Sequence, residues 1–94
     1  MIIRFVKMTF ETGKEGDFLN VFNNSSEKIR SFNGCEFLEL LRDVNQTNIF
    51  FTHSIWKSEK HLEKYRNSFL FKETWASTKV LFSDKPQAWS LIKK

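Results

Sequence analysis

The sequence is poor in residues that support disulfides, tight turns and membrane insertion. Its 94 residues include one cysteine, one proline and three glycines. The single Cys35 excludes an intrachain disulfide and is weakly typical of a reducing compartment. The stretch from Met1 to Met8 is interrupted by Arg4 and Lys7, so it cannot form a signal-peptide core, and no long apolar run occurs elsewhere. These absences predict a soluble cytoplasmic protein without a membrane segment.

Sequence motifs for metal, phosphate and nucleophile chemistry are also missing. His53 and His61 lie on different expected elements, and neither HExxH nor CxxC occurs. The glycines do not form a phosphate-binding loop, and there is no G-x-S-x-G nucleophile elbow. The acidic residues have the pattern of surface positions. The sequence therefore predicts no metal site and no recognisable hydrolase site.

The chain is basic, with 15 Lys and Arg against 11 Asp and Glu and a net charge of +4. Charges of both signs alternate, which is typical of a solvated mixed surface. RNA-recognition domains with the same order of elements combine a basic residue, a glycine and aromatics on the third strand. The corresponding stretch here, NIFFTHSIW, has no Gly, Lys or Arg. Nucleic-acid binding is therefore not expected.

Periodicity predicts six elements in one domain spanning residues 1–94. Alternating apolar residues predict strands, and apolar residues at three-to-four spacing predict helices. A kink is expected near Asn67 and Ser68, because neither residue supports a helix interior well. The expected strands are Ile2–Phe10, Cys35–Asp43, Asn48–Trp56 and Gln87–Ile92, and the expected helices are Lys14–Phe32 and a region from Ser58 to the turn at residues 83–86.

This order predicts an α+β fold of the ferredoxin-like βαββαβ type. Right-handed crossovers place the helices on one face of an antiparallel sheet. The first and third strands nevertheless carry apolar residues on both faces, and 16% of the residues are aromatic. A bare apolar sheet is typical of an interface. We therefore expect a homodimer packed sheet to sheet.

No other segment of the chain holds as many large aromatic and titratable side chains as the stretch from Phe50 to Trp75. His53 is either a partly buried histidine with a satisfied hydrogen bond or a proton acceptor near neutral pH. Tyr65 and Trp75 are either core residues or the walls of a site for an aromatic ligand. Charged strand residues could face a pocket or a partner subunit, and the sequence leaves both open: Arg4, Lys7 and Arg42.

The chain resembles the antibiotic biosynthesis monooxygenase (ABM) domain family, a branch of the dimeric α/β-barrel group. The resemblance covers essentially the whole chain. It is carried by a strand ending in Trp56-Lys-Ser-Glu, by a glycine turn, Phe32-Asn-Gly-Cys, and by helix positions Leu62, Tyr65, Ser68 and Phe71.

This resemblance implies a dimer with facing sheets and, in each subunit, a pocket between sheet and helices. It also implies oxidation of a small phenolic, quinol or polyketide-like aromatic by O2, without a metal, flavin or haem cofactor. Haem degradation is not expected, because Val6, Tyr65 and Trp75 depart from the Asn, Trp and His of the haem-degrading members.

The expected catalytic residues are His53 and Tyr65, and the expected substrate-binding residues are Trp56, Trp75, Phe22 and Phe71. Two alternatives keep the same fold. One is a non-catalytic module that binds a small aromatic ligand, and the other is a structural dimer whose aromatic residues all belong to the core.

Overall fold

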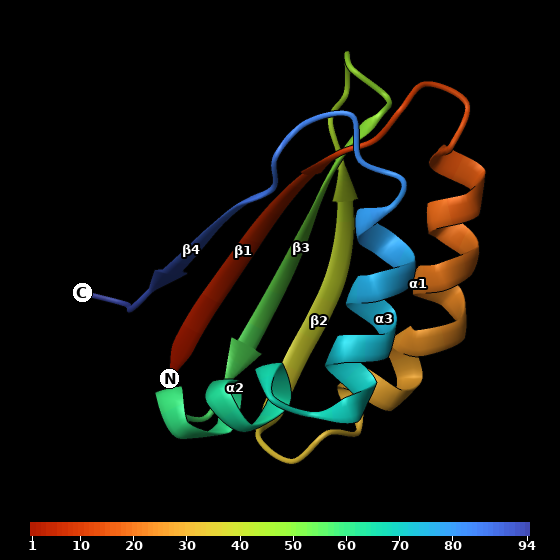
Figure 1. Cartoon of the computed structure of the whole chain (residues 1–94). Coiled ribbons are helices and arrows are strands. Elements are labelled where there is room, and N and C mark those ends of the chain that lie inside the picture. Colours follow the sequence, from red (N-terminus) through yellow and green to blue (C-terminus); the bar gives the residue numbers. More distant parts are fainter.

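The computed structural model describes all residues from 1 to 94 and contains a four-stranded sheet covered by three helices on one face (Figure 1). The ends of the elements agree with the sequence-based prediction to within two residues, except that the second helical region ends at Lys79, three residues short of the predicted turn at residues 83–86. No helix is long and apolar enough to cross a bilayer. In chain order the elements are β1 (Ile2–Thr9), α1 (Glu15–Arg30), β2 (Cys35–Arg42), β3 (Ile49–Trp56), α2 (Glu59–Arg66), α3 (Phe69–Lys79) and β4 (Gln87–Leu91).

The sheet confirms the ferredoxin-like arrangement. Its strand order is β2-β3-β1-β4, and every neighbouring pair is antiparallel. β1 and β2 are therefore parallel to each other, with β3 inserted between them, and α1 makes the crossover. Such a crossover is right-handed in nearly all proteins, which explains why α1 and the later helices cover the same face.

The expected kink in the second helical region is a complete break. Asn67 is the C-cap of α2. Ser68 is the N-cap of α3 and has an extended backbone, and its Oγ accepts a hydrogen bond from the backbone N–H of Phe71 at 3.1 Å. Ser58 caps α2 in the same way through the N–H of His61 at 3.3 Å. Serine suits both positions because its short side chain reaches the unpaired N–H groups of a first helical turn. The break turns α3 alongside α1 (Figure 1).

The turn between α1 and β2 depends on Gly34. Its φ is +95°, a conformation that glycine adopts without steric cost. A Cβ at this position would also collide with the side chain of His61. The turn is fastened to the end of β3 by a hydrogen bond from the N–H of Lys57 to the carbonyl of Gly34 at 2.9 Å. The glycine turn therefore fixes the start of α2 against the start of β2.

Two apolar clusters hold the helices to the sheet. The first joins the three strands β1, β2 and β3 to α1 and α2 around Trp56, which is 1% exposed. The second surrounds Phe10, whose ring stacks on that of Phe18 at 4.3 Å between centroids. Between them the helix-facing side chains leave a hollow, which is the candidate site described below.

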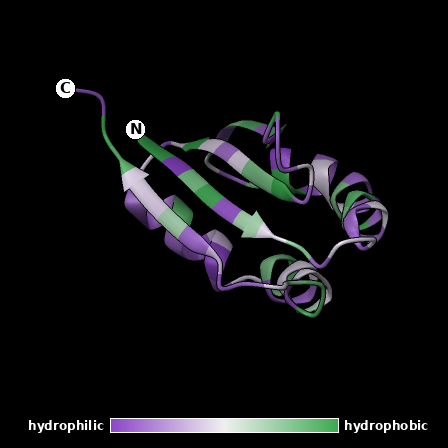
Figure 2. Ribbon diagram, turned by 90° about the horizontal axis from the view of Figure 1, so that it is seen from above, coloured by the Kyte–Doolittle hydropathy of each residue, from purple (hydrophilic) through white to green (hydrophobic).

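The outer face of the sheet carries apolar side chains without any covering layer. Hydrophobic and hydrophilic residues alternate along the strands (Figure 2). On the edge strands Phe37 and Leu41 of β2 and Trp89 and Leu91 of β4 are each 40–47% exposed. The sequence-based expectation that both faces bear apolar residues is thus met, and one face remains open to solvent.

Candidate functional site

A cavity of about 340 Å³ lies between the helix-facing side of the sheet and the helices. Thirteen of its 22 lining residues are hydrophobic, which makes it suitable for an apolar ligand. Its volume is at the lower end of the ~300–1,000 Å³ typical of ligand sites, which matches a small aromatic compound. A cavity beside Tyr65 also argues against the structural-dimer alternative, in which all aromatic residues would be core.

Four aromatic side chains form a continuous wall of this cavity. Trp56 stacks on Tyr65 with ring centroids 4.7 Å apart, and Tyr65 meets Phe71 edge-on at 5.2 Å. Phe71 in turn stacks on Trp75 at 5.9 Å. Offset and edge-on contacts of this kind stabilise aromatic clusters by about 0.5–1.5 kcal/mol a pair. The wall therefore offers a ligand a preformed set of flat apolar surfaces.

The break between α2 and α3 is what assembles this wall. Tyr65 is in the last turn of α2, whereas Phe71 and Trp75 are on α3, one turn apart. In one continuous helix there would be no cap at Ser68, and the aromatic side chains on the sheet-facing side would all lie along a single helix axis. Phe22 of α1 lines the cavity as well. Of the six residues predicted to form the site, the structure thus brings together five, which are Tyr65 and the four predicted to bind substrate.

Tyr65 has the properties of a proton donor. Burial, and next the charge of Cys35 when ionised, raise the pKa of its hydroxyl well above the ordinary tyrosine value. The hydroxyl therefore stays protonated at neutral pH. It makes no hydrogen bond within the chain and is not sealed from open space. Tyr65 can thus donate to an oxygen of a bound ligand.

Three other hydroxyl groups of the cavity are already engaged. The hydroxyl of Ser25 donates to the carbonyl of Val21 at 2.8 Å, and that of Thr78 donates to Thr74 at 2.8 Å. Ser54 accepts the indole N–H of Trp56 at 3.0 Å. Buried hydroxyls satisfied in this way cost little and fix neighbouring side chains. The polar side chains left without such a bond include those of Tyr65, Thr52, Thr74 and Gln87, and the two arginines keep N–H groups free to address a ligand.

Arg4 and Arg66 are the site residues that the sequence reasoning missed. The sequence did not decide whether Arg4 faces a pocket or a partner subunit, and it gave no reason to single out Arg66. Arg4 belongs to the same face of β1 as Ile2, Val6 and Met8, and this parity was the available signal. Both arginines line the cavity. Arg66 had no such signal, since helix α2 is polar around much of its circumference.

His53 does not belong to the cavity. It lies on the outer face of β3, where its ring stacks on Phe5 at 4.5 Å and meets Phe37 edge-on at 5.2 Å. Its Nδ1 is 2.7 Å from Oε2 of Glu39. The structure therefore corrects the expectation that His53 accepts a proton from a substrate in this pocket. Side chains alternate between faces along a strand, and His53 has the opposite parity to Thr52, Ser54 and Trp56.

The fold and the aromatic cavity define a class: ferredoxin-like α+β proteins with a small-molecule pocket between sheet and helices. The sequence matches the family model described as "Antibiotic biosynthesis monooxygenase" over residues 1–77. The chain therefore belongs to the ABM family, as its residues suggested. No curated protein matches the sequence.

Solved structures agree with this assignment of the fold. A conserved protein from Methanosarcina mazei Go1 has a TM-score of 0.93 and 22% identity, covering 100% of this chain and 94% of its own. A structure described as an antibiotic biosynthesis monooxygenase has a TM-score of 0.94 and 13% identity, covering 100% and 99%. A protein from Pseudomonas aeruginosa has a TM-score of 0.87 and 16% identity, covering 99% and 93%.

Proposed function

We propose that this protein oxidises a small phenolic, quinol or polyketide-like aromatic with O2, without a metal, flavin or haem. The observation that carries the proposal is the cavity walled by Trp56, Tyr65, Phe71 and Trp75. Family membership supports the same class of reaction. A flat, electron-rich ring would lie against this wall, with its oxygen directed at the Tyr65 hydroxyl.

The proposed chemistry needs no external reductant. In an anthrone-type substrate, the reacting carbon loses its two hydrogens and gains one oxygen atom of O2 as a carbonyl. The other oxygen atom leaves as water with those two hydrogens, so the substrate supplies all four electrons. Tyr65 stabilises the deprotonated substrate by donating a hydrogen bond to its oxyanion. The substrate proton passes to water at the cavity mouth, because no His, Asp or Glu lines the cavity.

Oxygen uptake tests this proposal directly. Metal-free and flavin-free protein is supplied with hydroquinones, naphthols and anthrones, and uptake is compared with the uncatalysed rate. We expect uptake with at least one compound, and about a hundredfold loss of kcat in Tyr65→Phe, because one donor to a developing oxyanion is removed. Phe69→Leu is the matched control, since Phe69 is 78% exposed and outside the cavity.

A second candidate function is binding without catalysis. The lack of any base among the lining residues favours it specifically, since the same cavity would hold an aromatic ligand by burial alone. This reading predicts that a compound of the panel raises the melting temperature while no oxygen is consumed. Oxygen uptake above the uncatalysed rate would exclude it.

We also propose that two copies pair through the outer face of the sheet. Its exposed apolar side chains and the stacked Phe5–His53 pair form a surface that a second copy would cover. Light scattering at micromolar concentration should give the mass of a dimer. Phe37→Asp, on this face, should give a monomer, whereas Phe69→Asp, at an exposed position of α3, should leave the dimer intact. A wild-type monomer would refute the proposal.

A further inference from the structure

The charge inside the cavity has one sign. Among the 22 lining residues, Arg4 and Arg66 are the only ones with a full charge, and no acidic side chain lines the wall. The remaining polar members are hydroxyls and one amide, that of Gln87. An otherwise apolar cavity with two guanidinium groups attracts negative charge, because low-dielectric walls concentrate the field.

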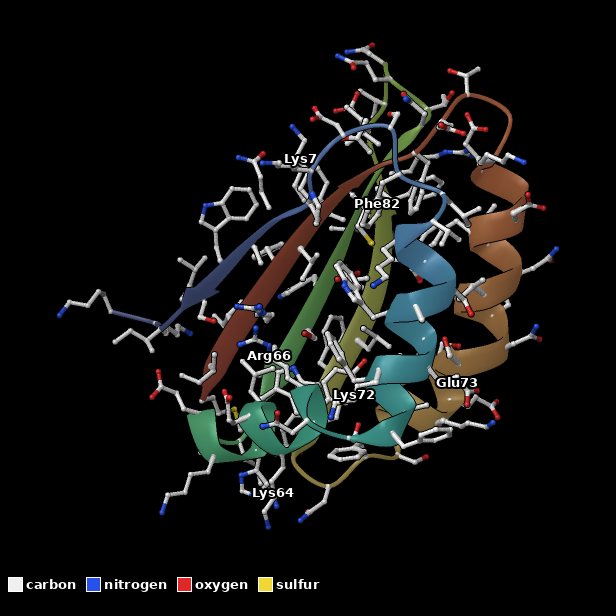
Figure 3. All side chains as sticks on the ribbon, viewed as in Figure 1. Lys7, Lys64, Arg66, Lys72, Glu73 and Phe82 are labelled. Carbon is white, nitrogen blue, oxygen red and sulfur yellow. The ribbon has the colours of Figure 1, made fainter.

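Two separate elements bring these cations to one end of the cavity. Arg4 is paired in register with Ser54 of β3 and Ser90 of β4, so its side chain rises from the sheet on the helix-covered side. Arg66 is the last residue of α2, directly before the helix break. Figure 3 shows Arg66 over the sheet, whereas Lys64 of the same helix points away from it.

Neither guanidinium has a close carboxylate partner. Arg4 donates from Nη1 to the hydroxyl of Ser90 at 2.8 Å, which leaves its other N–H groups free. The one carboxylate recorded in contact with Arg66 is Glu63, whose Oε2 is 3.9 Å from Nη1 and whose side chain is 67% exposed. Such a long, solvated contact neutralises little charge.

The two cations also act on each other. Burial, and then the charge of Arg66, lower the pKa of Arg4, while Glu63 raises it to a smaller extent. Arginine remains charged in spite of such shifts. Arg66 also lines an adjoining surface depression, so this end of the cavity is its solvent side; the other residues of the depression are Glu59, Lys60, Leu62, Glu63 and Ser90. Two like charges held together at an entrance are stabilised by an anion placed between them.

We propose that Arg4 and Arg66 form an oxyanion clamp, so that the cavity takes aromatic anions, with the ring against the aromatic wall and a carboxylate or phenolate oxygen between the two guanidinium groups. This proposal rests on the aromatic-binding function proposed above and narrows its substrate class. Guanidinium suits such an anion because its N–H groups form a planar fork that matches a carboxylate. A neutral aromatic of the same shape would bind more weakly.

Calorimetric titration with a matched pair of ligands tests the clamp. The pair is naphthalene-2-carboxylate and its neutral analogue naphthalene-2-carboxamide, which have similar shape and different charge. We expect the carboxylate to bind at least tenfold more tightly, since charge-assisted hydrogen bonds are about twice as strong as neutral ones. Raising the salt concentration should weaken the binding of the carboxylate and leave the binding of the carboxamide unchanged.

Three variants locate the effect. Arg4→Gln should weaken carboxylate binding about tenfold, and Arg66→Gln about three- to fivefold, because Arg66 is 46% exposed and better screened. Lys64→Gln removes the same charge from the same helix outside the cavity and should change nothing. Arg66→Gln and the salt titration keep the test valid if Arg4→Gln fails to fold.

The outcomes separate this proposal from the one on which it rests. Equal affinity for the two ligands, or equal losses in Arg66→Gln and Lys64→Gln, would overturn the clamp and leave the aromatic cavity standing. Binding of neither ligand would overturn the clamp and the proposed aromatic-binding function together. Tight carboxylate binding that both arginine variants reduce would establish an aromatic anion as the substrate class.

Discussion

Raising the pH provides the sharpest test of the Tyr65 environment. The chain contains one tyrosine, so the near-ultraviolet absorbance of tyrosinate reports this side chain alone. Burial first, and the charge of Cys35 second, raise the pKa of Tyr65 above the ordinary value of about 10. We therefore expect no tyrosinate while the protein is folded. The band should appear only together with the loss of circular dichroism.

The size of the effect follows from linkage. Because the folded pKa is raised, the folded state keeps its proton where the unfolded state has lost it. Stability from this group is thus complete below about pH 10 and falls above it by about 1.4 kcal/mol per pH unit. The slope for wild type is compared with that for Tyr65→Phe, so that the contributions of all other groups cancel. The difference between the two slopes should equal this value.

The competing result is easily recognised. If tyrosinate appears near pH 10 while the circular dichroism of the folded state persists, the hydroxyl is solvated in the native protein. Its role as a protonated donor inside a dry cavity would then be refuted. Equal slopes of stability against pH for wild type and Tyr65→Phe would refute this role as well.

Three further predictions concern stability, each measured by urea unfolding. Gly34→Ala should lower the free energy of unfolding by about 2–4 kcal/mol, because it combines a positive φ with a collision against a side chain of α2. Gly13→Ala, at a φ of +96° with open space around it, should lower it by only about 1–2 kcal/mol. Equal losses in the two variants would exclude the collision. Phe10→Ala, at 0% exposed, should cost about 3–5 kcal/mol, against less than about 0.5 kcal/mol for the exposed Phe69→Ala. Ser68→Ala should cost about 1 kcal/mol and Ser68→Asp little, since aspartate also caps a helix; equal losses would show that the cap does not stabilise α3.

The fold was predictable because each element carries its own local signal. Alternation in Ile2–Thr9 and three-to-four spacing in Glu15–Arg30 give the type of each element, and Gly34 and Ser58 mark the ends between them. The order of strands and helices, with the right-handed crossover, then leaves few topologies. The break at Ser68 was foreseen only as a kink, because serine is poor inside a helix but good at its start.

The site was less predictable because it depends on which face each side chain takes. β3 is apolar on both faces, so its sequence gives no reason to place His53 inside or outside. Pairing settles the question, since Glu39 and Phe5 flank His53 on the outer face. Large aromatic residues such as Tyr65 were found because a small domain has few places to bury them. Arg66 depends on the angle at which α2 ends, which no local pattern encodes.

The absence of a base from the cavity bears on the proposed oxidation, because the substrate would have to lose its proton without a protein base. A phenol becomes electron-rich either by giving its proton to a protein base or by having its own pKa lowered. A unit charge about 5 Å from an oxyanion contributes about 3 kcal/mol at an effective dielectric constant of about 20. Even if exposure of Arg66 halves this value, the arginine pair would lower the pKa of a bound phenol by more than about one unit. A substrate that is already acidic would then need no protein base. The arginine pair would thus account for the lack of a base in the cavity. Wild-type turnover that follows the pKa of the substrate across a series of phenols would be the kinetic sign of this mechanism.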